Sequence, residues 1–115
     1  MTDITRLDAS ARMSEAVIHG DTVYLAGQVG EAGDDVTAQT KTVLAEIDSL
    51  LARAGTDRSK ILMATIWLAD IGDFGAMNAV WDAWVDKGNP PARATSEGRL
   101  ATPDYLVEII VVAAR

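Results

Sequence analysis

The chain has 115 residues, which suits one domain over residues 1–115 with a hydrophobic core of its own. It contains no cysteine, so disulfide bridges, thiolate metal sites and cysteine nucleophiles are excluded. With 17 acidic and 10 basic residues the net charge is −7, and no cluster of Lys and Arg is present, which argues against a nucleic acid as partner.

Neither end of the sequence resembles a membrane segment. Residues 1–6 lack the apolar core of a signal peptide, and the longest apolar runs, such as residues 109–114, are too short to span a bilayer. We therefore expect a cytoplasmic protein with no membrane partner. Hydrophobic residues make up 49% of the chain, a high share that hints at burial between subunits.

The first half predicts a β-hairpin and a helix. Residues 1–14 are polar and are expected to be irregular, whereas residues 16–19 and 22–26 are rich in β-formers and flank the turn signal Gly20-Asp21. Asp34 and Asp35 then offer an N-cap for a helix that stops at Gly55. Its apolar stripe comprises Val36, Val43, Leu44, Ile47, Leu50, Leu51 and Ala54.

The second half predicts three strands and a second helix. Residues 61–68 are apolar on both alternating faces, which is typical of a central strand. Asp73 is expected to cap a helix that ends at Gly88, and residues 89–91, Asn-Pro-Pro, force an extended entry into strands over residues 93–100 and 105–113. The expected buried stripe of the helix is Phe74, Met77, Trp81, Trp84 and Val85, and Trp67 is also expected in the core.

The order ββαβαββ predicts an α+β fold, a two-layer sandwich in which both helices cover one face of a single sheet. The opposite face would be exposed in a monomer, which again indicates that subunits associate.

Glu108 is the only charged residue on an otherwise apolar strand, where it shares a face with Leu106, Ile110 and Val112. Burying an unpaired carboxylate is costly, so this side chain is expected to be paired, hydrogen-bonded or protonated. One interpretation is an edge position where Glu108 reaches water. The other is a functional carboxylate suited to proton transfer, and the spacing alone does not separate the two.

Arg93 follows a stiff Pro-Pro-Ala entry, so its guanidinium, whose planar fork matches a carboxylate, would be held at little entropic cost. An ordinary surface arginine, or an ion pair with Glu108, is the plainer interpretation. Thr95 lies two residues on and shares the face of Arg93.

Three further residues are weaker candidates. Gly27, at the end of a strand, would let a ligand approach the backbone closely. Asn78 sits beside the apolar stripe of the second helix, where a purely structural role is the plainer interpretation. His19, the only histidine, is expected to be exposed near the hairpin turn, and no phosphate loop, dinucleotide fingerprint or metal-ligand spacing is present.

Four segments, taken together, resemble the RidA/YjgF family of reactive intermediate deaminases over roughly residues 12–114. They are residues 24–29 (YLAGQV), 70–78 (DIGDFGAMN), 91–93 (PAR) and 107–109 (VEI). Within that family the chain looks similar to the YoaB-like branch.

The resemblance implies a homotrimer with a chorismate-mutase-like fold, a mixed sheet and active sites between subunits. It also implies hydrolysis of 2-imino or 2-enamino acids to 2-keto acids and ammonia, as in 2-iminobutanoate/2-iminopropanoate deaminases. Arg93 would hold the substrate carboxylate, Glu108 would position or activate water, and Gly27 and Asn78 would lie at the site. Thr95, which shares a strand face with Arg93, could contact whatever Arg93 binds. A protonated imine is already electrophilic, so we expect neither a metal nor a cofactor.

The chain departs from the family pattern at three places. Ala26 and Thr95 stand where the family often has serine and cysteine, and the usual N-terminal tyrosine has no clear match around Met13. A non-enzymatic trimer that binds a small carboxylate as a metabolite sensor or interaction module is therefore the alternative. A ribonuclease, another activity attached to the family by name, is disfavoured by the charge of −7.

Overall fold

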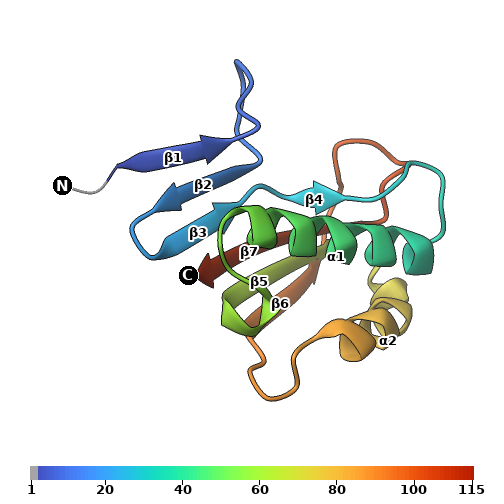
Figure 1. Cartoon of the computed structure of the whole chain (residues 1–115). Helices are drawn as coiled ribbons and strands as arrows, with labels where there is room; N and C mark the ends of the chain where they lie inside the picture. The colour runs from blue at the N-terminus through green and yellow to red at the C-terminus, as the bar shows by residue number, and fades with distance from the viewer. Residues whose placement is uncertain (1–2) are drawn as a thin grey trace.

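The computed structural model describes residues 3–115 as one sheet covered on one face by two helices (Figure 1). The helices are α1 (Val36–Arg53) and α2 (Phe74–Trp84), with 3-10 turns η1 (Arg58–Lys60) and η2 (Ile71–Asp73). The strands are β1 (Ile4–Leu7), β2 (Ala16–His19), β3 (Thr22–Leu25), β4 (Gln28–Val29), β5 (Ile61–Leu68), β6 (Ala92–Glu97) and β7 (Val107–Ala114). The predicted two-layer α+β architecture is confirmed.

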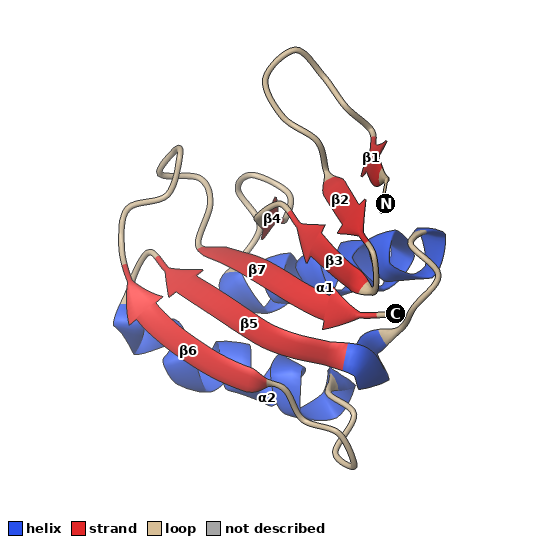
Figure 2. Ribbon diagram, turned by 90° about the vertical axis from the view of Figure 1, so that its left-hand side faces the viewer, coloured by secondary structure: helices blue, strands red, loops and turns tan. Residues whose placement is uncertain are grey.

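The sheet is mixed, and β7 lies in its interior. The strand order is β1-β2-β3-β7-β5-β6, with β4 also pairing with β7. The β5–β6 pair is parallel, joined by a crossover through α2, and the other described pairs are antiparallel. Figure 2 shows β7 and β5 in the middle of the sheet, with the helices behind it. Because β7 is flanked on both sides, the interpretation of Glu108 as an edge residue is wrong.

The first helix forms as its sequence predicts. The Asp35 carboxylate accepts a hydrogen bond of 2.8 Å from the Ala38 amide, and Gly55 follows the helix with a φ of 83°. Every residue of the predicted stripe is buried. Gln39, which was not expected in the core, donates to the carbonyls of Asp34 and Asp104 and accepts from the Leu106 amide, each at 2.9 Å. Gln39 therefore ties the loop before β7 to α1.

The second helix is shorter than predicted. It ends at Trp84, not Gly88, because Val85 adopts an extended backbone with a ψ of 143°. The Asp86 carboxylate then accepts from the Gly88 amide and forms a turn ahead of the prolines. Asp73 occupies the N-cap position without a capping hydrogen bond from its side chain. Phe74 is 41% exposed, so its assignment to the core is wrong.

Two strands, β1 and β4, were not predicted. β1 is almost entirely exposed, and its residue Ile4 pairs with His19 of β2. β4 has only two residues, too few for a periodic signal. The last loop spans residues 98–106 and is longer than expected, because β6 already ends at Glu97.

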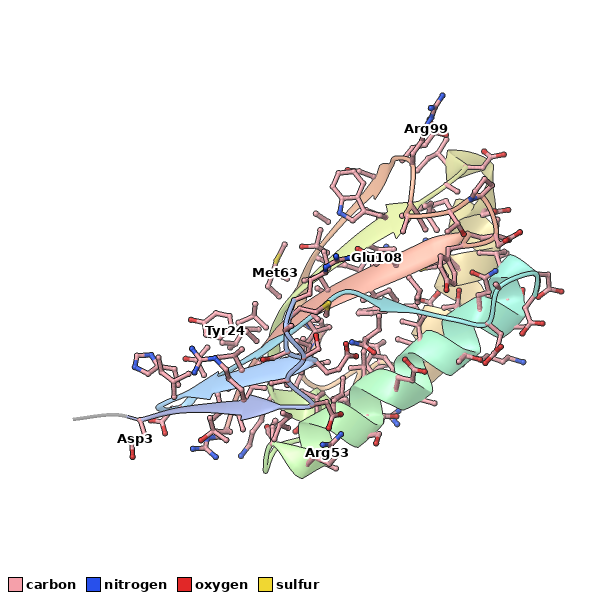
Figure 3. All side chains as sticks on the ribbon, turned by 90° about the horizontal axis from the view of Figure 1, so that it is seen from above. Asp3, Tyr24, Arg53, Met63, Arg99 and Glu108 are labelled. Atoms are coloured by element: carbon pink, nitrogen blue, oxygen red, sulfur yellow. The ribbon has the colours of Figure 1, made fainter. Side chains whose placement is uncertain are left out.

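The sheet face away from the helices is apolar and uncovered within one chain. Tyr24, Leu62 and Trp67 are 48%, 53% and 37% exposed on it, so Trp67 is not a core residue of the single chain. Figure 3 shows Tyr24 and Met63 on the side of the sheet away from α1, while Arg53 lies on the helix side. None of the helices within residues 3–115 has the length and apolar content needed to cross a membrane.

Candidate active site

Glu108 lies half-buried on the uncovered face of the sheet. Along β7 its neighbours Val107 and Ile109 point into the core, so Glu108 points the opposite way, as Figure 3 shows. Its partners on the adjacent strands are Trp67 of β5 and Val29 of β4. A cleft of about 340 Å³ opens beside it, lined by Trp67, Gly98, Arg99, Leu100, Ala101 and Glu108. The carboxylate is thus reachable from this face, in a cleft that also contains Arg99.

Gly27 packs directly against the Glu108 carboxylate. A Cβ atom at position 27 would lie 2.6 Å from Glu108 Oε2 and 2.8 Å from its Cδ. No real Cβ approaches another atom so closely, so the absence of a side chain at Gly27 lets Glu108 adopt its observed position. The structure therefore brings together these two predicted site residues.

We expect Gly27→Ala to displace the Glu108 carboxylate while leaving the fold intact. The added methyl group meets the end of a flexible side chain, so the carboxylate rotates away at small cost in stability, below about 1 kcal/mol. Gly30→Ala is the matched control, because its Cβ would lie 2.7 Å from Gln39 Cα, a backbone atom that cannot move aside. Thermal unfolding should separate the two, with Gly30→Ala losing about 1–3 kcal/mol. Equal destabilisation by both variants would contradict this account.

Arg93 lies on the opposite face of the sheet, under α2. In the parallel β5–β6 pair Arg93 is beside Ala64 and Thr95 beside Ile66, and both partners are fully buried on the helix side. Arg93 Nη1 donates a 2.7 Å hydrogen bond to Asn78 Oδ1. The structure therefore brings Arg93 and Asn78 together and confirms that Thr95 shares their side of the sheet.

Neither candidate charge forms an ion pair within residues 3–115. Among residues 3–115 the ion pairs are Arg53–Asp8 and Arg58–Asp48, so Arg93 and Glu108 both lack a partner of opposite charge there. Their positions on opposite faces exclude the direct Arg93–Glu108 pair as an intramolecular contact. Thr95 Oγ1 is also buried with no hydrogen-bond partner in the described chain. A buried hydroxyl of this kind normally has a partner, so it is available to a ligand or to a second chain.

The candidate residues of one chain thus form two groups, one on each face of the sheet. We call Glu108 with Gly27 the acid half-site, and Arg93 with Asn78 and Thr95 the arginine half-site. Sequence reasoning missed the aromatic residues of both: Trp67 beside Glu108, and Phe74 and Trp81 beside Arg93. Phe74, Asn78 and Trp81 recur at helical spacing, which was a usable signal that one helix face meets Arg93.

Other polar regions are weaker candidates for a functional site. His19 is exposed, as predicted, and no group of His, Asp and Glu able to hold a metal occurs within residues 3–115. A cleft between α1 and the segment that follows β1 contains Glu15 and Glu46. Desolvation, followed by repulsion from Glu15 and Glu31, raises the pKa of the Glu46 carboxyl. The Gln28 amide already donates to Glu15 in this cleft, at 3.3 Å.

Comparisons with known proteins match the whole chain to one family. The family model described as endoribonuclease L-PSP matches residues 3–115. The RutC family protein YoaB of Escherichia coli is 49% identical over 111 residues, covering 96% of this chain and 97% of that protein. The chain belongs to the RidA/YjgF family.

Two further matches describe the range of this RidA/YjgF protein's relatives. The crystal structure of a YjgF family member from Neisseria meningitidis superposes with a TM-score of 0.96 at 46% identity, covering 98% of this chain and 95% of that one. The rat protein named 2-iminobutanoate/2-iminopropanoate deaminase is 32% identical over 107 residues, covering 87% of this chain and 77% of that protein. The relatives from Haemophilus ducreyi and Escherichia coli, which are 48% and 49% identical to this chain, are named as RutC family proteins.

Proposed function

We propose that this RidA/YjgF protein hydrolyses 2-imino and 2-enamino acids to 2-keto acids and ammonia. The observation that carries the proposal is the pair of uncompensated charges, a guanidinium on one face of the sheet and a carboxylate on the other. The rat deaminase, a relative at 32% identity, adds support from the comparisons. A substrate with a negative carboxylate and an electrophilic imine carbon uses both groups.

In this reaction Arg93 binds the substrate carboxylate through its free N–H groups, and Thr95 Oγ1 supplies a further hydrogen bond. Glu108 orients a water molecule and removes its proton as the oxygen attacks the imine carbon. The resulting carbinolamine carries the hydroxyl and the amine on one carbon. Glu108 returns this proton to nitrogen and then accepts the proton of the hydroxyl group, so that the C=O bond forms as the C–N bond breaks and ammonia leaves with the keto acid. Positioning of water against a bound substrate supplies much of the rate.

We further propose that the complete site forms between copies in a homotrimer. Within one chain the two half-sites lie on opposite faces of the sheet, so one ligand reaches both only if a second copy contributes one of them. The uncovered face, with Tyr24, Leu62 and Trp67, offers the apolar surface that such an interface needs. A ring of head-to-tail contacts pairs the arginine half-site of one copy with the acid half-site of the next.

The decisive experiment generates 2-iminobutanoate in the presence of the protein and follows ammonia and 2-oxobutanoate. The wild-type protein should release ammonia and 2-oxobutanoate faster than buffer alone does. A measurement of its molecular mass in solution should give that of a trimer. No acceleration with several imino acids, together with saturable binding of a keto acid, would instead favour the non-enzymatic carboxylate-binding trimer. Ala26 and Thr95 support that alternative, because they stand where the family pattern often has serine and cysteine.

The family model is named after an endoribonuclease, but the charge of this chain disfavours ribonuclease activity. The net charge is −7, and Arg93, held on the helix side of the sheet, is not part of a basic run in the sequence. Binding to RNA draws its affinity from clustered Lys and Arg, which are lacking in this sequence.

A further inference from the structure

The Arg93 guanidinium lies against two aromatic rings of α2. Its Cζ atom is 5.3 Å from the centroid of the Trp81 ring and 5.8 Å from that of the Phe74 ring. Between these two residues along the helix, Asn78 accepts the 2.7 Å hydrogen bond from Nη1. Phe74, Asn78 and Trp81 are spaced by four and three positions, so they form one face of α2. This face, which we call the arginine clamp, holds the guanidinium from one side.

The other arginine that lies over an aromatic ring shows what is unusual about Arg93. Arg58 lies 4.8 Å from the Trp84 ring centroid, but its Nε and Nη2 also donate to the Asp48 carboxylate at 3.1 and 2.6 Å. Its charge is therefore neutralised in place. Each contact of Arg93 is made to an uncharged group, so the clamp fixes its position and leaves its charge for an external anion. A ring quadrupole attracts a cation without competing as a bidentate partner.

The clamp has one rigid side and one open side. Trp81 is only 5% exposed, and its ring centroid lies 5.4 Å from that of Trp84. Trp84 Nε1 in turn donates to Asp48 at 2.9 Å, within the same ion pair that holds Arg58. Phe74, by contrast, is 41% exposed, so its ring lies at the solvent boundary of the arginine half-site.

We propose that Phe74 and Trp81 are positioning residues that hold Arg93 in the orientation in which it binds a carboxylate. The inference rests on the carboxylate-binding role proposed above for Arg93. Arginine has several rotatable bonds, and confining them before the ligand arrives lowers the entropy lost on binding. Loosening the clamp should therefore weaken binding of the carboxylate and raise KM, while kcat changes little, because Glu108 and the water are untouched.

The test compares Phe74→Leu with the conservative Phe74→Tyr, using pyruvate as the ligand. Phe74→Leu should raise the Kd for pyruvate by about threefold, as expected for one exposed cation–π contact, and Phe74→Tyr should bind like the wild type. Trp81→Phe and Trp81→Leu form a second pair, with the same order expected. Phe74 is the safer site, because it is exposed and its loss leaves the core intact.

Two readouts separate positioning of Arg93 from direct contact with the ligand. In the free protein, the NMR resonance of the Arg93 Nε–H group, identified by its loss in Arg93→Lys, should shift in Phe74→Leu and return towards its wild-type position in Phe74→Tyr. In an Arg93→Ala background, Phe74→Leu should add no further loss of pyruvate binding. An unmoved resonance, or an equal loss of affinity in both backgrounds, would overturn the proposal.

The outcome also distinguishes this inference from the proposed activity. If the wild type binds pyruvate without hydrolysing imines, and Phe74→Leu weakens that binding, the activity falls and the clamp stands. If hydrolysis proceeds and Phe74→Leu leaves both Kd and KM unchanged, the clamp falls and the activity stands. A wild type that neither hydrolyses imines nor binds a keto acid overturns both.

Discussion

Glu108→Gln should abolish most of the imine hydrolysis while leaving keto-acid binding nearly unchanged. The amide keeps the size and hydrogen-bonding capacity of the side chain but cannot accept a proton from water, and general base catalysis contributes about 10²–10⁴-fold to a rate. Since Gly27 and the walls of the cleft are untouched, the site keeps its shape. Steady-state release of ammonia gives kcat, and titration with pyruvate gives Kd.

Glu31→Gln is the matched control for this substitution. It makes the same chemical change at an exposed glutamate and should leave kcat at the wild-type value. Glu108→Asp should fall between wild type and Glu108→Gln, because the carboxylate is kept but withdrawn from its contact with Gly27. A kcat for Glu108→Gln equal to that of the wild type would remove Glu108 from the mechanism.

Most of the fold could be predicted because its elements carry strong periodic signals. The stripe from Val36 to Ala54 predicts α1, and the apolar run over residues 61–68 predicts β5 with its observed bounds. β1 has no such signal, since its four residues are nearly all exposed and become a strand only by pairing with β2. The end of α2 depends on the local turn at Asp86, which hydrophobic spacing does not report.

The candidate site was only partly predictable, for a reason rooted in the sheet. Side chains alternate between the two faces of β7, so Glu108 and Ile109 point to opposite sides. Because both faces of the strand are apolar, the sequence does not indicate which face the helices cover. The same ambiguity applies to Arg93 on β6. Whether the two groups share a face, and hence one subunit, follows only from the register of β5 with its two neighbours. The link between Asn78 and Arg93 is likewise a tertiary contact.

Arg93→Ala should lower kcat/KM by about 10²–10³-fold, because removing one member of a buried charge pair costs several kcal/mol of binding. The loss of Arg93 should appear mainly as a raised KM, whereas Glu108→Gln should mainly lower kcat.

The proposed site between copies also predicts the behaviour of mixtures of two variants. If each site takes Arg93 from one copy and Glu108 from its neighbour, two inactive variants can assemble intact sites.

Equal amounts of Arg93→Ala and Glu108→Gln, unfolded and refolded together, should therefore recover activity that neither variant has alone. With random assembly each site draws its two halves from independent copies, so about one site in four is intact and turnover approaches a quarter of the wild-type value. Arg93→Ala mixed with the Arg93→Ala/Glu108→Gln double variant is the control, because no copy in that mixture supplies an arginine. Mixed oligomers that form but recover no activity would mean that the two half-sites do not meet across the interface, and the proposed mechanism would fail with them.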